Sequence, residues 1–121
     1  MSKRILVVED HEDNRRILRD LLTASGFELI EAVSGEDGII EAEREQPDLI
    51  LMDIQLPGLD GYETTRRIRA IPSLAKTPII AVTSYALSGD EPRALAAGCD
   101  AYVTKPFSPR ALLAKVREYL P

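Results

Sequence analysis

The stretch DLILMDIQLPGLDG, residues 48–61, decides the fold. Its first half is apolar on both faces, which is typical of a central strand in a parallel sheet. The apolar run stops at an acidic residue, Asp53, and the turn-forming residues Pro57 and Gly58 follow closely. A strand of this kind presents its last side chain at an edge of the sheet, so Asp53 is a candidate functional carboxylate.

Four other apolar runs of strand length alternate with helix-like segments along the chain. The predicted strands span residues 4–9, 27–32, 48–53, 78–84 and 101–104, and the predicted helices span 14–25, 34–45, 61–71, 90–97 and 108–120. This alternation predicts an α/β fold whose parallel sheet carries helices on both faces. We expect the flavodoxin-like (βα)5 doubly wound arrangement, a five-stranded sheet of order 2-1-3-4-5 with residues 27–32 at one edge.

Two of the predicted helices contain residues that disfavour helix. Ser34 is placed as the N-cap of the helix at 34–45. Gly38 lies inside this helix, where glycine costs about 1 kcal/mol relative to alanine, so we expect the helix to be soft. Pro92 falls in the first turn of the helix at 90–97, where proline is tolerated.

Composition narrows the class of protein. The 121 residues predict one compact domain, residues 1–121, with ordinary hydrophobic content of 45% and a net charge of −5. That charge disfavours nucleic-acid binding, and no segment approaches the roughly 20 apolar residues of a membrane span. Cys99 is the single cysteine, so no internal disulfide forms, and we expect a cytoplasmic protein in which Cys99 is a small buried residue.

Charged and polar residues stand at the carboxyl ends of four of the predicted strands. They are Glu9 and Asp10, Asp53, Thr83, and Lys105. Since the carboxyl ends of parallel strands share one edge of the sheet, we expect these side chains to gather there. Any one of them alone has an ordinary explanation as a cap, strand or solvated residue, but their coincidence at four strand ends favours a functional site.

Three carboxylates in one place repel one another unless a cation neutralises them. Oxygen ligands suit Mg²⁺, which takes one or two carboxylates and keeps several waters. We expect Asp10 and Asp53 as direct ligands, Glu9 acting through a water, and the Gln55 backbone carbonyl completing the set. His11 lies beside the acidic pair, but no partner of metal-ligand spacing is evident, and a solvated loop residue is favoured.

A carboxylate beside Mg²⁺ and a lysine can act as a nucleophile toward phosphorus and form an acyl phosphate. Asp53 is the best candidate because the residues before it are wholly apolar and hold it rigidly. Lys105 would balance negative charge and hold a phosphate oxygen, and the Thr83 hydroxyl can donate to the same phosphate.

The motifs ILVVED, DLILMDIQLPGLDG, PIIAVTSYA and AAGCDAYVTKPF, in this order, resemble the receiver domain of two-component response regulators, nearest to the stand-alone single-domain members. The resemblance covers essentially the whole chain. It implies that Asp53 accepts a phosphoryl group from a phosphohistidine on a sensor histidine kinase or histidine phosphotransfer protein. It further implies the Mg²⁺ ligands already named and a contact between Lys105 and the phosphoryl group.

The resemblance also implies how phosphorylation is read and removed. Thr83 and Tyr102 form the switch pair, and the Lys105–Pro106 bond is often cis. Gln55 and Tyr85 flank the water that attacks the acyl phosphate. The output surface is formed by the fourth helix, fifth strand and fifth helix, and includes Ala86, Leu95, Tyr102 and Phe107. His11 departs from the family, which often has a third acid or Asn at this position.

The predicted function is therefore phosphorylation-dependent signalling through protein contacts or phosphorelay, by a monomer or weak dimer and not by an enzyme. Two alternatives stay open. A phosphorylation-independent scaffold on the same fold predicts loss of the acids or the lysine, and all are present. A Mg²⁺-dependent phosphohydrolase of the dehalogenase-like kind needs a second acid two residues after the nucleophile, where this chain has Gln55.

Overall fold

The computed structural model describes residues 2–83, 90–105 and 108–121. Its five strands form one parallel sheet of order β2-β1-β3-β4-β5, as predicted, with β2 at an edge. The strands are β1 (Arg4–Val8), β2 (Glu28–Ala32), β3 (Leu49–Asp53), β4 (Ile79–Thr83) and β5 (Ala101–Thr104). The helices are α1 (Glu12–Ala24), α2 (Gly35–Glu45), α3 (Gly61–Arg69), α4 (Asp90–Ala97) and α5 (Pro109–Tyr119), with a short 3-10 helix η1 at Pro72–Leu74.

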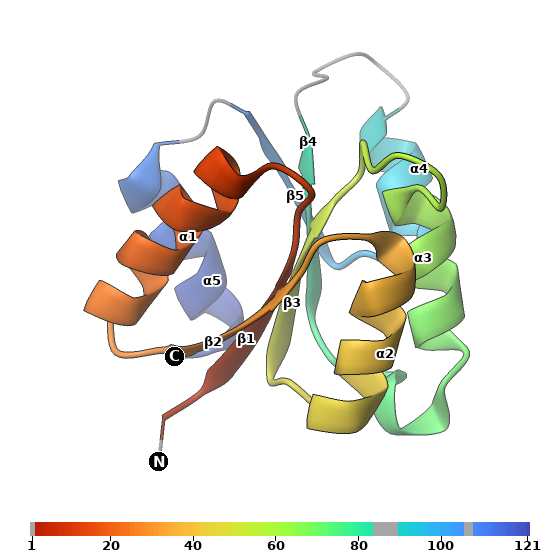
Figure 1. Ribbon diagram of the computed structural model, residues 1–121, viewed down its shortest axis with the longest axis horizontal. Coiled ribbons are helices and arrows are strands. Elements are labelled where there is room, and N and C mark those ends of the chain that lie inside the picture. Colours follow the sequence, from red (N-terminus) through yellow and green to blue (C-terminus); the bar gives the residue numbers. More distant parts are fainter. Residues whose placement is uncertain (1, 84–89, 106–107) are drawn as a thin grey trace.

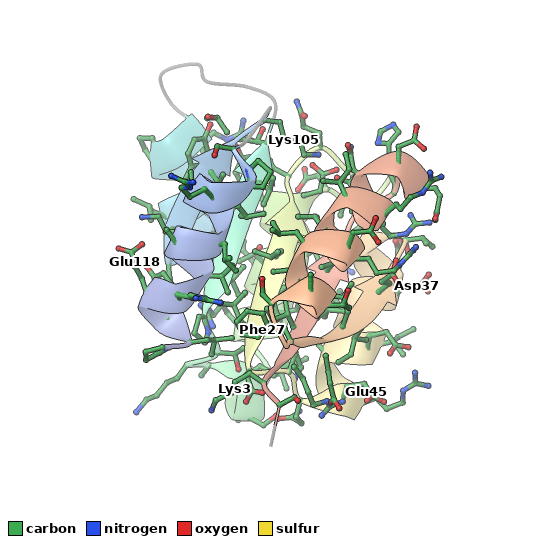
Figure 2. The ribbon with its side chains drawn as sticks, turned by 90° about the vertical axis from the view of Figure 1, so that its left-hand side faces the viewer. Lys3, Phe27, Asp37, Glu45, Lys105 and Glu118 are labelled. Carbon is green, nitrogen blue, oxygen red and sulfur yellow. The ribbon has the colours of Figure 1, made fainter. Side chains whose placement is uncertain are left out.

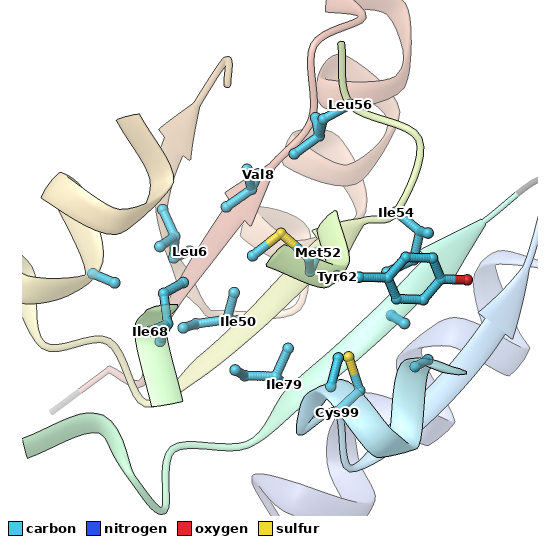
Figure 3. Packing of buried hydrophobic residues seen from close by; sticks show 14 of the residues in the cluster. Leu6, Val8, Ile50, Met52, Ile54, Leu56, Tyr62, Ile68, Ile79 and Cys99 are labelled. Carbon is cyan, nitrogen blue, oxygen red and sulfur yellow. The ribbon is translucent and has the colours of Figure 1, made fainter. Parts of the chain in front are cut away.

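The helices form two layers around the sheet. Figure 1 shows α1 and α5 on one face and α2, α3 and α4 on the other. Side chains alternate along each strand, so successive residues enter the two cores in turn. In β3, Ile50 and Met52 enter the core under α2–α4, shown in Figure 3, whereas Leu49 and Leu51 enter the core under α1 and α5. Every residue of β3 is buried, which explains why its sequence is apolar on both faces.

Helices α1 and α3 each have one end that lies two residues from the sequence prediction. Helix α1 begins at Glu12, two residues before the predicted Asn14, because Glu12 and Asp13 in its first turn interact favourably with the helix dipole. Helix α3 ends at Arg69, and the chain then forms η1 with Pro72 at its start, an element that the sequence did not indicate. Ser34 caps α2 as predicted, since its hydroxyl accepts a hydrogen bond from the Asp37 backbone N–H.

Gly38 has a packing role that helix propensity does not reveal. It is buried where α2 crosses β1, and a Cβ atom built on it would lie 2.9 Å from Cγ2 of Val8. Val8 is fully buried and β-branched, so its side chain has little room to rotate away. Glycine at this position therefore lets helix and sheet approach closely.

The Gly38→Ala variant is expected to have a free energy of unfolding about 1 kcal/mol lower than the parent protein, because the new methyl group overpacks the contact with Val8. Helix propensity alone predicts the opposite sign, a gain of about 1 kcal/mol. Urea denaturation measures the difference. Glu43→Ala, at an exposed position of the same helix, serves as the control and should change stability by less than about 0.5 kcal/mol. A more stable Gly38→Ala protein would contradict the packing argument.

No helix among the described residues is long and apolar enough to cross a membrane.

Candidate functional site

The register of the strands brings the predicted residues to one edge of the sheet. Val8 pairs with Met52 across β1 and β3, so Glu9 follows at the level of Asp53. Asp53 pairs with Val82 of β4, and Thr83 pairs with Thr104 of β5, immediately before Lys105. Figure 2 shows Lys105 at this end of the molecule and Lys3 and Glu45 at the opposite end.

Lys105 is fixed against the acidic residues. Its Nζ lies 2.7 Å from Oε1 of Glu9 and 3.7 Å from Oδ1 of Asp53. Its backbone N–H donates to the Thr83 carbonyl at 2.6 Å, which continues the β4–β5 pairing past the last strand residue. Glu9 and Asp53 are 2% and 3% exposed. The ammonium group of Lys105 therefore places a positive charge beside two buried carboxyl groups.

Asp53 is held by the backbone around it. Its Oδ1 accepts a hydrogen bond from the Gln55 N–H at 3.0 Å. The first residue of α3, Gly61, packs directly on the backbone of Asp53, since a Cβ atom at Gly61 would lie 2.3 Å from the Asp53 carbonyl oxygen. The carboxyl group is thus placed by a strand end, a turn and the start of a helix.

Burial separates the pKa values of the two inner carboxyl groups. Burial, followed by the hydrogen bond shared with Glu9, raises the pKa of Asp53 to about 7. Burial also acts to raise the pKa of Glu9, but hydrogen bonds from Lys105 and Asp53 outweigh it and lower that pKa to about 2. Without a cation, the Asp53 carboxyl group is therefore protonated below about pH 7, and its O–H donates a hydrogen bond to the ionised carboxylate of Glu9.

Asp10 and His11 form the outer part of the cluster. Within residues 2–83, 90–105 and 108–121, Oδ1 of Asp10 is the one buried side-chain oxygen or nitrogen atom that has no hydrogen-bond partner. Nδ1 of His11 lies 3.3 Å from this oxygen and 3.5 Å from Oε2 of Glu9. The prediction that His11 has no partner at metal-ligand spacing is therefore wrong, although its side chain is exposed as expected.

Ligand atoms of four residues converge on one point. One atom each from Glu9, Asp10, His11 and Asp53 lies within 4.8 Å of the others. Three carboxyl groups with an unsatisfied buried oxygen provide the hard oxygen ligands that Mg²⁺ prefers. The residues present thus fit a divalent cation.

Arg15 supports the site, and sequence reasoning missed it. Its guanidinium donates to the Glu9 carbonyl oxygen at 2.8 Å and also pairs with Glu12 and Glu31. It thereby anchors the turn between β1 and α1 that carries Asp10. An arginine in a first helical turn is too common to be singled out from the sequence alone.

The residues predicted to form the switch and the output surface lie on β4, β5 and α4 where the structure describes them. Thr83 is fully buried at the end of β4, and Tyr102 of β5 is half-buried against the core under α2–α4. Leu95 of α4 is 49% exposed. The other predicted positions, Tyr85, Ala86, Phe107 and the Lys105–Pro106 bond, lie outside the described residues.

Cys99 is buried as predicted, and burial raises the pKa of its thiol to about 11.

Comparison with known proteins identifies the family to which this site belongs. The family model of the response regulator receiver domain matches residues 5–117. The chain belongs to the response regulator receiver domain family. The receiver domain is 43% identical over 120 residues to the polar-differentiation response regulator DivK of Brucella ovis, and the match covers 99% of this chain and 98% of that protein.

Solved structures give the same result for the fold. The receiver domain of the sensor histidine kinase PA1611 from Pseudomonas aeruginosa, with a magnesium ion coordinated in its active site cleft, has 38% identity and a TM-score of 0.92, covering 99% of this chain and 98% of that one. A CheY-like receiver domain protein from Methanospirillum hungatei has 35% identity and a TM-score of 0.90, covering 99% and 94%. Chemotaxis protein CheY4 of Vibrio cholerae, at 24% identity and a TM-score of 0.94, shares the fold over 98% of this chain and 99% of that one.

The raised pKa of Asp53 predicts that this receiver domain binds Mg²⁺ in competition with a proton. Below about pH 7 the cation must displace the proton of Asp53, so the apparent dissociation constant is expected to rise about tenfold for each pH unit. Above about pH 7 it should be constant. Calorimetric titration with MgCl₂ between pH 6 and pH 8.5 measures both regimes, and proton release appears as a dependence on the ionisation enthalpy of the buffer.

The same group links pH to the stability of the cation-free protein. The pKa of Asp53 in the folded protein, about 7, lies above the ordinary value of 3.8. Protonation of Asp53 therefore makes its full contribution to the free energy of unfolding below about pH 4, and this contribution is lost as the pH rises through 7. Magnesium should therefore stabilise the protein more at pH 8 than at pH 6. Equal magnesium affinity at pH 6 and pH 8 would contradict this assignment.

Proposed function

We propose that residues 1–121 act as one receiver domain that accepts a phosphoryl group on Asp53, in a Mg²⁺-dependent reaction, from the phosphohistidine of a histidine kinase or histidine phosphotransfer protein. The observation that carries the proposal is the position of Asp53 at the end of the buried strand β3, with Lys105, Glu9 and the cation ligands around it. Family membership supports it, since receiver domains take phosphoryl groups from histidine kinases. We place the protein in the cytoplasm, as a monomer or weak dimer.

The chemistry follows from this geometry. The ionised Asp53 carboxylate attacks phosphorus, a new P–O bond forms, and the P–N bond of the phosphohistidine breaks. The electron pair of that bond returns to the departing imidazole nitrogen. Lys105, whose Nζ is 3.7 Å from Asp53, is close enough to pair with an oxygen of the transferred group.

The cation site contributes charge neutralisation. Asp10, Asp53 and the Gln55 backbone carbonyl would hold Mg²⁺, and Glu9 would act through a bound water. Mg²⁺ held there would supply positive charge for the phosphoryl oxygens. The unsatisfied Asp10 Oδ1 supports this role, because a buried oxygen without a partner is costly.

Phosphorylation adds negative charge and acceptor oxygens at Asp53. In the proposed switch, the buried hydroxyl of Thr83 donates to the phosphoryl group, and the half-buried Tyr102 turns into the space that Thr83 leaves. A partner selective for the changed surface reads the state. This surface includes Leu95 and, outside the described residues, Ala86 and Phe107. Gln55 and Tyr85 set the lifetime of the acyl phosphate.

The protein is proposed to act as a signalling component that catalyses only its own phosphotransfer and dephosphorylation. The test is incubation with acetyl phosphate with and without Mg²⁺, followed by intact-protein mass spectrometry. One phosphoryl group per chain that requires Mg²⁺ supports the proposal. Absence of incorporation with either acetyl phosphate or a phosphorylated histidine kinase favours the scaffold alternative, and turnover of p-nitrophenyl phosphate favours the phosphohydrolase.

A further inference from the structure

His11 is the one histidine of the sequence, and its imidazole lies against the cation site. Its Nδ1 is 3.3 Å from the unsatisfied Oδ1 of Asp10 and 3.5 Å from Oε2 of Glu9. Although Asp10 Oδ1 and His11 Nδ1 are close, they make no hydrogen bond. The imidazole therefore leaves the buried oxygen unsatisfied.

The distances from Nδ1 of His11 to the Asp10 and Glu9 oxygens are close to the distance between two ligand atoms bound to one metal ion. Two ligands of a tetrahedral Zn²⁺ ion, with bonds of about 2.0–2.1 Å, lie about 3.3 Å apart. One ion placed between Nδ1 of His11 and Oδ1 of Asp10 would satisfy both atoms. Glu9 and Asp53 each offer a carboxylate oxygen to the same group, in which one ligand atom from each of the four residues lies within 4.8 Å of the others.

The backbone holds His11 in this position. Its N–H donates to Oε2 of Glu9 at 3.2 Å, and its carbonyl accepts from the Arg15 N–H at 3.0 Å at the start of α1. The side chain is 69% exposed, so a cation can enter from solvent on this side and the ring can rotate onto it. The imidazole thus needs no rearrangement of the chain to act as a ligand.

We propose that His11 supplies a nitrogen ligand to the cation site and that the site consequently takes a divalent transition metal, Zn²⁺ being the expected example, as well as Mg²⁺. Imidazole is a good ligand for zinc and cobalt, whereas Mg²⁺ prefers oxygen and gains little from it. The inference rests on the proposed function, because it concerns the same cation site. It adds that the identity of residue 11 sets which metals the site selects.

Metal affinities of untagged variants test the inference. Zn²⁺ binding is measured by competition with a chromogenic chelator, and Mg²⁺ binding by calorimetry. His11→Asn is expected to weaken Zn²⁺ binding about 30-fold and to change Mg²⁺ binding less than about threefold. His11→Asp is expected to invert the preference, with tighter Mg²⁺ and weaker Zn²⁺ binding. Asp13→Asn, whose side chain is 91% exposed, is the matched control and should change neither affinity by more than about twofold.

A spectroscopic signature identifies the ligand independently of affinity. Because the chain has one histidine, a paramagnetically shifted imidazole proton resonance in the Co²⁺-loaded protein can come only from His11. We expect that resonance in the parent protein and its loss in His11→Asn. Zn²⁺ affinity unchanged in His11→Asn, or Co²⁺ loading without the shifted resonance, overturns the inference.

The same data separate this inference from the proposed function. If Asp10→Asn weakens Mg²⁺ binding but the parent protein and His11→Asn bind Zn²⁺ equally well, the inference fails and the proposed function stands. If Asp10→Asn changes neither Mg²⁺ nor Zn²⁺ binding, the cation site is wrongly placed and both fail.

Discussion

The Asp53→Asn variant is expected to incorporate no phosphoryl group from acetyl phosphate or from a phosphorylated histidine kinase, a loss of at least about 10³-fold in rate. The amide is not a competent nucleophile toward phosphorus, and no other carboxyl group of the cluster occupies the same place at the end of β3. Glu9 is engaged by Lys105 at 2.7 Å, and Asp10 lies farther out, with His11 beside it. Intact-protein mass spectrometry with Mg²⁺ present measures the result.

This loss can be distinguished from unfolding. Asparagine has the shape of the protonated aspartic acid that the cation-free protein carries below about pH 7. Asp53→Asn should therefore fold, with a melting temperature at pH 8 equal to or above that of the parent protein. The control is Asp13→Asn at an exposed position of α1, which should be phosphorylated at the parental rate. Stoichiometric incorporation into Asp53→Asn would show that another residue is the acceptor.

The Gly61→Ala variant is expected to lose about 3 kcal/mol of stability and most of its phosphorylation activity. Its methyl group would lie 2.3 Å from the Asp53 carbonyl oxygen and 2.5 Å from Cα of Ile54. Both are backbone atoms, so no rotamer change relieves the overlap, and the end of β3 must move away from α3. The stability loss corresponds to a fall in melting temperature of about 10 °C.

A substitution at Gly58 provides the matched control for Gly61→Ala. Gly58 lies in the same turn and has a positive φ of 73°, but a Cβ atom there would meet nothing within 4 Å. Gly58→Asn, which places a residue that tolerates this conformation, should lower stability by less than about 1 kcal/mol and leave phosphorylation unchanged. Equal effects of the two substitutions would mean that chain flexibility, and not the contact with Asp53, makes glycine necessary at position 61.

The convergence of the candidate site residues could be predicted because parallel strands place their carboxyl ends together. Asp53 and Lys105 are 52 positions apart in the sequence, yet each follows an apolar run of strand length, and that pattern is sufficient to bring them to one edge. The alternation along β1 and β3 also explains why Glu9 and Asp53 emerge on the same face of the sheet, above the core under α1 and α5. These inferences need only periodicity and strand order.

Features that depend on distances between elements could not be predicted in this way. Gly38 and Gly61 resemble any helix glycine in sequence, and their roles appear only when the approach to Val8 and to the Asp53 backbone is measured. The side chain of His11 and the contact from Arg15 to the Glu9 carbonyl depend on the conformation of the turn after β1. Sequence periodicity carries no information about such turns.

The residue that carries the phosphoryl group can be located chemically. After phosphorylation with Mg²⁺, borohydride reduction converts the acyl phosphate to a stable alcohol, and tryptic peptide mapping locates it. The predicted product lies in the peptide spanning residues 45–66, with fragment ions that place it at Asp53. Reduction in the peptide spanning residues 5–15, which contains Glu9 and Asp10, or at any residue without a requirement for Mg²⁺, would contradict Mg²⁺-dependent phosphorylation of Asp53.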